Sequence, residues 1–504
     1  MGWELRILKV LGDVHPPTPS KFGIFPVKNG RAKILFIFAG IAFALFLVTF
    51  TRYESYTSLY DAEYVGAEKC GECHTVTYEN WQASGHAKMV REPSPETVLA
   101  NFTNGSWTPP MEARSSPNDN TPVARFYTEG EDYYVALRDP NTNEFVSFKV
   151  AYVIGSHYRQ EFLIQEPGGV IRRFPLQWSI PQGYYFPYWN LQENSLPTVS
   201  DLWAQMTVQN SAWNLFCARC HTTHLVIHAK DDAHTHADAE WTDLGIACEA
   251  CHGPGSHHVN YFENNKVNRL VAFLNSKLRG EPVAYIANAP KLTRGQDLSV
   301  CGRCHGADIW LTSTDIYRTY EPGYSREGRV NDISIHFQEA PLTPGREAPT
   351  VEVWHDGTPK GIGMLFRSFI ESDHYRQSDM ACSDCHDPHN NFLPAKPGML
   401  APSAESNTYC LSCHENLKGQ EAEHSQHAPN TEGYFCYDCH APYRLKNLAT
   451  GIDTRARTHD MSASPDPAAS VTFGLENSPN ACNNCHTDQT PEWAVEWMQT
   501  WWEE

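Results

Sequence analysis

Positive charge is scarce in this sequence. Its 504 residues include 39 Lys and Arg against 59 Asp and Glu, which gives a formal net charge of −20 at pH 7. This balance argues against nucleic acid as a partner, because the two surfaces would repel each other. It favours a basic or locally positive partner, or an acidic surface that serves solubility alone. Long low-complexity segments are also lacking.

No cysteine is left over for a disulfide or a catalytic nucleophile. All 16 cysteines belong to C-x-x-C-H motifs, in which a histidine directly follows the second cysteine. In chain order, and numbered motif 1 to motif 8 below, these are Cys70/Cys73/His74, Cys217/Cys220/His221, Cys248/Cys251/His252, Cys301/Cys304/His305, Cys382/Cys385/His386, Cys410/Cys413/His414, Cys436/Cys439/His440 and Cys482/Cys485/His486.

C-x-x-C-H is the attachment signal of c-type haem. The two thiols bond the porphyrin vinyl groups, and the imidazole binds the iron. The rival interpretations are a zinc site and a redox dithiol. Neither requires a histidine after every second cysteine, so the repetition favours haem. The sequence predicts eight covalently attached haem c groups, with the motif histidines as proximal iron ligands.

The remaining histidines are numerous enough to supply sixth ligands. Of the 24 histidines, 16 lie outside the motifs, and the 15 of these that follow the apolar run at residues 34–50 number nearly two for each open iron position, so bis-histidine ligation is expected throughout. In ACEACHGPGSHH, for example, His257 or His258 is placed to serve a neighbouring haem. Methionine (Met89, Met380 or Met461) is the alternative sixth ligand. The candidates are His86, His224, His257, His258, His374, His389, His427 with His424 as second choice, and His459.

A single long apolar run, ILFIFAGIAFALFLVTF, occupies residues 34–50. As a helix it would cover roughly 25 Å, slightly less than a bilayer core. Thioether haem attachment takes place outside the membrane, so the chain must be exported. A cleavable signal peptide is the alternative, but no small-x-small site follows the run. We predict an uncleaved signal anchor, residues 34–52, in a bacterial or archaeal cell membrane, with the haem domain on the periplasmic or extracellular side.

The spacing of the motifs predicts the domain organisation. Motifs 1 and 2 are widely separated, and the later motifs crowd together. Between motifs 1 and 2, apolar and polar residues alternate over 146–154 as in a β-strand, and residues 124–137 indicate hairpins. The predicted fold is mostly α with extensive loops packed around covalent haems, plus a β-rich insert and one N-terminal transmembrane helix. The predicted segments are a cytoplasmic tail (1–33), the anchor (34–52), the first haem module (53–110), the β-rich insert (111–200), motifs 2–4 (201–330) and motifs 5–8 (331–504).

Several of these segments carry a family resemblance. YVGAEKCGECHTVTYENWQASGHAKM, WNLFCARCHTTH, GIACEACHGPGSHHV and SDMACSDCHDPHNNFL resemble multihaem cytochromes c related to hydroxylamine oxidoreductase and the pentahaem nitrite reductases. The resemblance covers residues 64–502, and many members of this group carry tetratricopeptide repeats. It implies sixth ligands in the glycine-proline segment, in D-P-H and in R-x-H, which here correspond to His258 or His257, His389 and His459.

The motifs favour electron transfer over substrate conversion. Nitrite reductases of this superfamily use a C-x-x-C-K haem with an open iron position, and no such motif occurs here. The rival hypothesis is an oxidoreductase that acts on a small nitrogen or sulfur compound at one open haem. A third is a haem-wire subunit of a larger respiratory complex or filament. The expected partners are a membrane redox complex or quinol-oxidising subunit, other cytochromes and the membrane.

Overall fold

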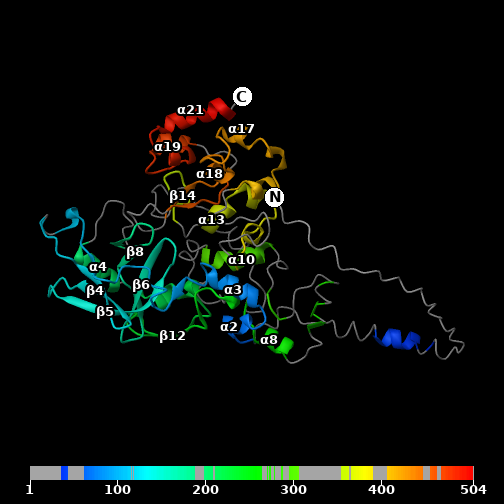
Figure 1. Ribbon diagram of the computed structural model, residues 1–504, viewed down its shortest axis with the longest axis horizontal. Coiled ribbons are helices and arrows are strands. Elements are labelled where there is room, and N and C mark those ends of the chain that lie inside the picture. The colour runs from blue at the N-terminus through cyan, green and yellow to red at the C-terminus, as the bar shows by residue number, and fades with distance from the viewer. Residues whose placement is uncertain are drawn as a thin grey trace, which may run out of the picture. The chain divides into compact units, whose positions relative to one another are not determined.

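The computed structural model divides into two units, Met1–Tyr53 and Glu54–Glu504. The residues whose structure is described are 34, 36–43, 62–114, 116, 118–187, 198–207, 211–263, 269–270, 272–273, 277, 285–287, 294–305, 353–361, 365–389, 406–446, 455–461 and 467–502 (Figure 1).

The predicted anchor falls mostly outside these ranges. Residues 34 and 36–43 are helical, and residues 35 and 44–52 are not described. Within the described part of the chain, no helix has both the length and the apolar character needed to cross a membrane. The anchor therefore remains a prediction.

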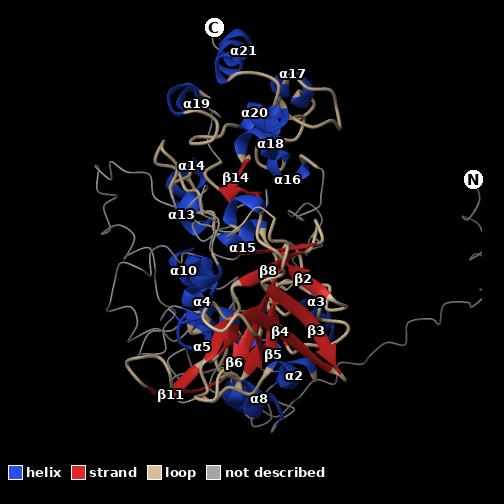
Figure 2. Ribbon diagram, turned by 90° about the vertical axis from the view of Figure 1, so that its left-hand side faces the viewer, coloured by secondary structure: helices blue, strands red, loops and turns tan. Residues whose placement is uncertain are grey.

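A nine-stranded antiparallel sheet forms the β-rich insert. Its main path runs β2-β3-β4-β5-β6-β8-β9, with β1 paired to β5 and β7 to β6. The first strand, β2, also contacts the last, β9, so the sheet nearly closes into a barrel (Figure 2). The strands are β1 Val90–Arg91, β2 Gly105–Trp107, β3 Ala124–Glu129, β4 Asp132–Arg138, β5 Phe145–Ile154, β6 Arg159–Gln165, β7 Ile171–Arg173, β8 Leu176–Ser179 and β9 Tyr184–Pro187.

The barrel has a core of its own. Apolar side chains at alternate strand positions point inward, but the alternation predicted for residues 146–154 breaks at a register shift after Val150, so that Val153 joins the barrel core and Ile154 packs on its outer face. Phe126 stacks on Tyr185 with ring centres 3.6 Å apart, and Phe162 packs against both. Phe126 and Phe162 have no exposed surface. The β-rich insert is thus confirmed, and two short strands before residue 111, β1 and β2, also join its sheet.

Short helices joined by loops carry the C-x-x-C-H motifs, as predicted. Three two-stranded sheets, β10-β13, β11-β12 and β14-β15, connect them. Those strands are β10 Thr222–Thr223, β11 Val226–Lys230, β12 Ala237–Glu240, β13 Asp243–Leu244, β14 Tyr443–Lys446 and β15 Arg455–Arg457. The helices are α2 Ala67–Gly71, α3 Thr75–Ala83, α4 Val199–Thr207, α5 Trp213–Phe216, α6 Ala218–His221, α7 Cys248–His252, α8 Ser256–Glu263, α10 Arg294–His305, α13 Leu365–Ile370, α14 Asp373–Gln377, α15 Cys382–Cys385, α16 Thr408–Leu411, α17 Glu421–Ser425, α18 Cys436–His440, α19 Ala468–Phe473, α20 Ala481–Cys485 and α21 Pro491–Trp502.

A buried carboxylate joins the segment before motif 1 to motif 3. Glu249, only 1% exposed, accepts hydrogen bonds from the backbone amides of Val65, Gly66 and Gly255 at 2.7–3.0 Å. These contacts link residues far apart in sequence and fix α2 against α7. A buried amide that loses its acceptor costs free energy, so this clamp holds the two motifs together.

We expect Glu249→Ala to loosen this junction locally. Loss of the acceptor should cost about 1–3 kcal/mol and speed hydrogen exchange at the Val65 and Gly66 amides by roughly 5- to 150-fold. The control is Glu263→Ala, which removes only an exposed ion pair with Lys69 in the same region and should change exchange little. Unchanged exchange in the Glu249 variant would contradict the clamp.

Candidate haem-binding sites

Each C-x-x-C-H motif includes helical residues that bring its three side chains close together. In motifs 1, 5, 6 and 8 the backbone amide of the histidine donates to the carbonyl of the first cysteine at 2.9 Å. This closes one α-helical turn, so both thiols and the imidazole project from the same short element. The turn therefore presents two thiols for covalent attachment and one imidazole for the iron, as c-type haem requires.

Seven of the eight motif histidines face a second histidine ring. A metal–nitrogen bond of about 2.0–2.1 Å, plus about 1.1 Å from that nitrogen to the ring centre, places two imidazoles on opposite sides of one metal about 6.2 Å apart. The observed spacings fit a bis-histidine iron. The pairs are His74–His258 (6.3 Å), His305–His86 (6.3 Å), His252–His389 (5.9 Å), His386–His459 (6.0 Å), His414–His374 (6.0 Å), His440–His424 (6.1 Å) and His486–His427 (6.1 Å).

Six of the predicted sixth ligands lie in these pairs, namely His86, His258, His374, His389, His427 and His459. His424, the second choice to His427, faces a different motif. Two further candidates lie elsewhere: His224 stacks on Tyr64 at 3.8 Å, and His257 contacts Tyr285. Ligation of iron by any of these histidines stays a prediction.

The second ring nitrogen of several paired histidines also has an acceptor. The Nδ1 atom of His252 lies 2.6 Å from the carbonyl oxygen of Ala287, and that of His427 lies 2.6 Å from the carbonyl oxygen of Ser425. His389 Nδ1 lies 3.0 Å from a carboxylate oxygen of Asp387. Such contacts fix the tautomer that leaves Nε2 for a metal. Burial also lowers the pKa of His305 and of His459 to about 4, so both imidazoles are neutral, as a metal ligand must be.

The cysteines of successive motifs lie close together. The thiols of motifs 1 and 3 (Cys70, Cys248), motifs 4 and 5 (Cys301, Cys382) and motifs 6 and 7 (Cys410, Cys436) lie near enough to perturb each other's pKa. Charge interactions link motif 3 to 4, 5 to 6 and 7 to 8. The motifs therefore form a row in the order 1-3-4-5-6-7-8. Figure 2 shows α10, α15, α18 and α20 following one another toward α21.

The second cysteines of five motifs differ in their surroundings. In Cys73, Cys220 and Cys413 the backbone amide donates to the carbonyl of the first cysteine of the motif at 3.0–3.2 Å, whereas Cys251 and Cys304 lie within α7 and α10. The thiol-bearing residues Cys73 and Cys413 are exposed, and the other three are half-buried. Cys251 interacts electrostatically with motif 4, and Cys413 with motif 5. The geometry alone does not confirm the predicted haem attachment at these five thiols, so it stays a prediction for each of them.

Motif 2 differs from the others. His221 is buried, and among the described residues no histidine ring faces it; its recorded ring contact is with Trp213, at 6.4 Å. Its Nδ1 atom is buried and has no hydrogen-bond partner in this part of the chain. The charged neighbours of the imidazole are Glu161, Arg173 and Arg159. Burial outweighs the attraction of Glu161 and lowers the His221 pKa to about 4.

Those charged neighbours come from the outer face of the barrel. Phe162 points into its core, so its neighbours in β6 point outward, and one of them, Leu163, packs with Cys217 and Ala218 of motif 2. Arg159 and Glu161 form an ion pair at 3.3 Å on this face. Gln177 has no exposed surface, and both of its amide atoms lack a partner among the described residues. Motif 2 thus lies against a buried polar surface.

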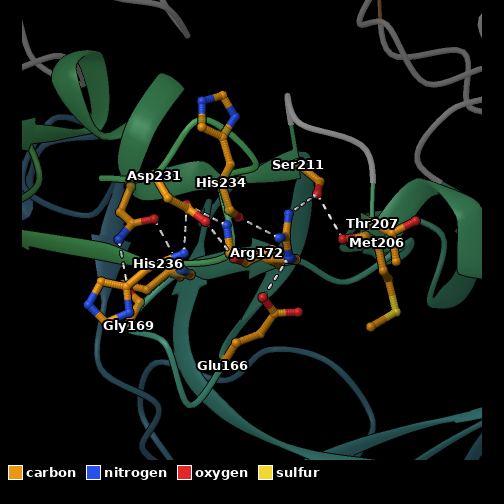
Figure 3. Close-up of polar contacts among 12 residues, drawn as sticks. Glu166, Gly169, Arg172, Met206, Thr207, Ser211, Asp231, His234 and His236 are labelled. Atoms are coloured by element: carbon orange, nitrogen blue, oxygen red, sulfur yellow. Dashed lines mark hydrogen bonds and ion pairs between the residues drawn. The ribbon is translucent and has the colours of Figure 1, made fainter. Parts of the chain in front are cut away.

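A polar network anchors the motif 2 segment to the barrel (Figure 3). The buried guanidinium of Arg172 donates to Glu166 at 2.8 Å, to Ser211 Oγ at 3.0 Å and to the His234 carbonyl at 2.7 Å. Asn214, in α5, accepts from the amide of Ile171 at 3.0 Å. Because α5 directly precedes Cys217, these bonds hold motif 2 in place on β7.

Comparisons with known proteins agree with the motif geometry. Residues 374–419 match a doubled CXXCH motif, and residues 69–106 and 192–253 match the cytochrome c554 and c-prime family. The chain is 21% identical over 473 residues to the dissimilatory sulfite reductase MccA of Wolinella succinogenes, covering 82% of this chain and 56% of MccA. It therefore spans little more than half of that relative's length.

Two further relatives are cytochromes. The multiheme cytochrome MtrA of Shewanella baltica is 26% identical over 287 residues, covering 54% of this chain and 76% of MtrA. The crystal structure of the outer cell wall cytochrome OcwA superposes with a TM-score of 0.49 at 16% identity, covering 87% of this chain and 86% of OcwA. The repeated C-x-x-C-H motifs, the two family-model matches and the sequence similarity to MccA identify the chain as a multihaem c-type cytochrome that carries several haem c groups attached through these motifs.

Proposed function

We propose that the protein relays electrons through eight covalent haem c groups. The observation that carries this proposal is the set of seven imidazole pairs at 5.9–6.3 Å, because filled axial positions favour electron transfer over substrate binding. Haem supplies one-electron redox chemistry when bound. The chain contributes paired axial ligands, and it brings successive motifs close enough for their thiols to interact.

The ring planes give this proposal a spectroscopic test. The electron paramagnetic resonance (EPR) spectrum of a low-spin ferric haem depends on the angle between its two imidazole planes. That angle is 81° for His374–His414 and 63° for His86–His305, against 12° for His424–His440 and 15° for His252–His389. We therefore expect two classes of low-spin signal from the full-length protein, those with the largest principal g value arising from the steeply crossed pairs.

Two adjacent histidines provide a matched pair of variants. His258→Ala should convert one haem from low-spin to high-spin without loss of covalent haem, since the thioethers and His74 remain. His257→Ala should leave the spectrum unchanged, because His257 faces Tyr285 rather than a motif histidine. A spectrum that is high-spin throughout in the unmodified protein, or an unchanged spectrum in the His258 variant, would contradict the proposed ligation.

A second candidate function is redox chemistry on a small oxyanion at motif 2. His221 faces no histidine in the described part of the chain, and the half-buried guanidinium groups of Arg159 and Arg173 are charged neighbours of its imidazole. Two guanidinium groups against one carboxylate leave this surface net positive, which suits an anion. MccA, a relative of this chain, is a dissimilatory sulfite reductase.

Carbon monoxide and sulfite together test the second candidate. The reduced protein should bind one equivalent of carbon monoxide. Arg173→Gln should weaken sulfite binding about 10-fold or more, the loss expected for a hydrogen bond to a charged group, while carbon monoxide binding persists. The control is Arg125→Gln, on the barrel beside Phe145, which should change neither. If no carbon monoxide binds, motif 2 is closed and only the relay function remains.

We further propose that residues 34–52 anchor the protein in a bacterial or archaeal membrane, with the haem-bearing part on the periplasmic or extracellular side. The proposed partners are a membrane redox complex or quinol-oxidising subunit, and other cytochromes. A chain that begins at Tyr53 behind a cleavable export signal should be recovered without detergent, whereas the full chain should require detergent. Recovery of the full chain in the soluble fraction with its N-terminus removed would contradict the anchor.

A further inference from the structure

Asp387 holds one of the paired imidazoles by an ionic hydrogen bond. Its Oδ1 atom lies 3.0 Å from the Nδ1 atom of His389 and also accepts the His389 backbone amide at 3.0 Å. The ring of His389 faces that of His252 in motif 3 at 5.9 Å. With Nε2 directed to a metal, Nδ1 carries the proton and donates it to the carboxylate.

The acceptor matters because it sets the donor strength of the imidazole. A carboxylate accepts a stronger hydrogen bond than a neutral carbonyl does, and it raises the basicity of the metal-binding nitrogen. The Nδ1 atoms of His427 and His459 have backbone carbonyls as partners instead. A more basic ligand stabilises the oxidised iron, so the Asp387–His389 contact lowers the reduction potential at motif 3 relative to those positions.

Motif 2 has the opposite environment. The buried Nδ1 atom of His221 has no acceptor among the described residues, so nothing there strengthens this imidazole as a donor. The surrounding charges are Arg159 and Arg173 against Glu161. Net positive charge in a buried site favours the state with the additional electron. Both effects raise the reduction potential at motif 2.

The two motifs are on segments that are tied together. Thr223, two residues after His221, accepts the amide of Ala247 at 2.8 Å and donates to the carbonyl of Gly245 at 3.0 Å. Ala247 directly precedes Cys248 of motif 3. A short antiparallel pairing of β10 with β13 supports the same junction.

We propose that Asp387 makes motif 3 a low-potential position and that His221, whose Nδ1 atom has no acceptor among the described residues, makes motif 2 a higher-potential position, so that electrons pass from motif 3 toward motif 2. This inference rests on the proposed relay function. The step is a one-electron transfer in which the iron held at motif 3 is oxidised and the iron held at motif 2 is reduced, with no proton transferred. It gives the relay a direction that the motifs themselves do not encode.

The test is a redox titration of the full-length protein followed by EPR and by carbon monoxide binding. Asp387→Asn removes the ionic contact and should raise the midpoint potential of one low-spin component by about 59 mV or more. This shift corresponds to a tenfold change in the equilibrium constant of a one-electron couple. Asp387→Glu keeps a carboxylate at this position and should therefore shift the midpoint potential less than Asp387→Asn does. In the unmodified protein, the component that binds carbon monoxide should be reduced before the Asp387-sensitive one.

Asp384→Asn is the matched control. Asp384 lies three residues away and carries the same charge, but it accepts the backbone amide of Ala381 and no imidazole. An equal shift in this variant, or none in Asp387→Asn, would overturn the role of Asp387. Reduction of the carbon monoxide-binding component after the Asp387-sensitive one would overturn the direction. In each of these cases the low-spin signals would persist; their absence would instead count against the relay function.

Discussion

The rest of the haem-bearing structure depends on one constraint, the facing of two imidazoles across about 6 Å. In each pair the rings belong to different segments, as with His86 and His305 or His386 and His459. Among the described residues, the apolar cluster beside motifs 4 and 5 has four buried members, Leu298, Phe366, Phe369 and Ala381. So small a cluster contributes little burial energy. Metal binding free energy is folding free energy in such a site, so haem ligation as proposed above would join these segments.

The barrel differs from the haem-binding segments because it has a larger apolar core. It buries an aromatic core of its own, and the outer face of its strands contacts motif 2. The guanidinium of Arg172 and the amide of Asn214 attach α5 to β7 through buried hydrogen bonds. Motif 2 is thus placed by the packing of protein on protein, whereas motifs 3 to 8 follow one another as a row of short helices. This difference explains why motif 2 can present a polar surface to its imidazole.

The sequence alone predicted what is local and missed what is long-range. Attachment cysteines and proximal histidines are adjacent in sequence, so the C-x-x-C-H pattern identifies them. The alternation of residues 146–154 likewise predicted β5. Which distal histidine faces which motif depends on contacts between remote segments. His257 and His258 are neighbours, yet they point in different directions on α8, because successive helical residues are rotated by about 100°. His424 and His427 were treated as alternatives, but each faces its own motif.

The environment of His221 could not be predicted from the sequence either, because Arg159, Arg173 and Gln177 belong to no recognisable motif. A buried ring nitrogen without an acceptor costs about 1–3 kcal/mol, and so does a buried amide such as that of Gln177. Folds rarely retain such costs without a compensating role. An acceptor for His221 would make its imidazole a stronger donor, and an apolar residue at position 177 would remove the polar surface. The unsatisfied Nδ1 atom of His221 lies at the one motif whose histidine lacks a facing ring in the described part of the chain, which is where a small anion or an incoming electron would be received under the proposed functions.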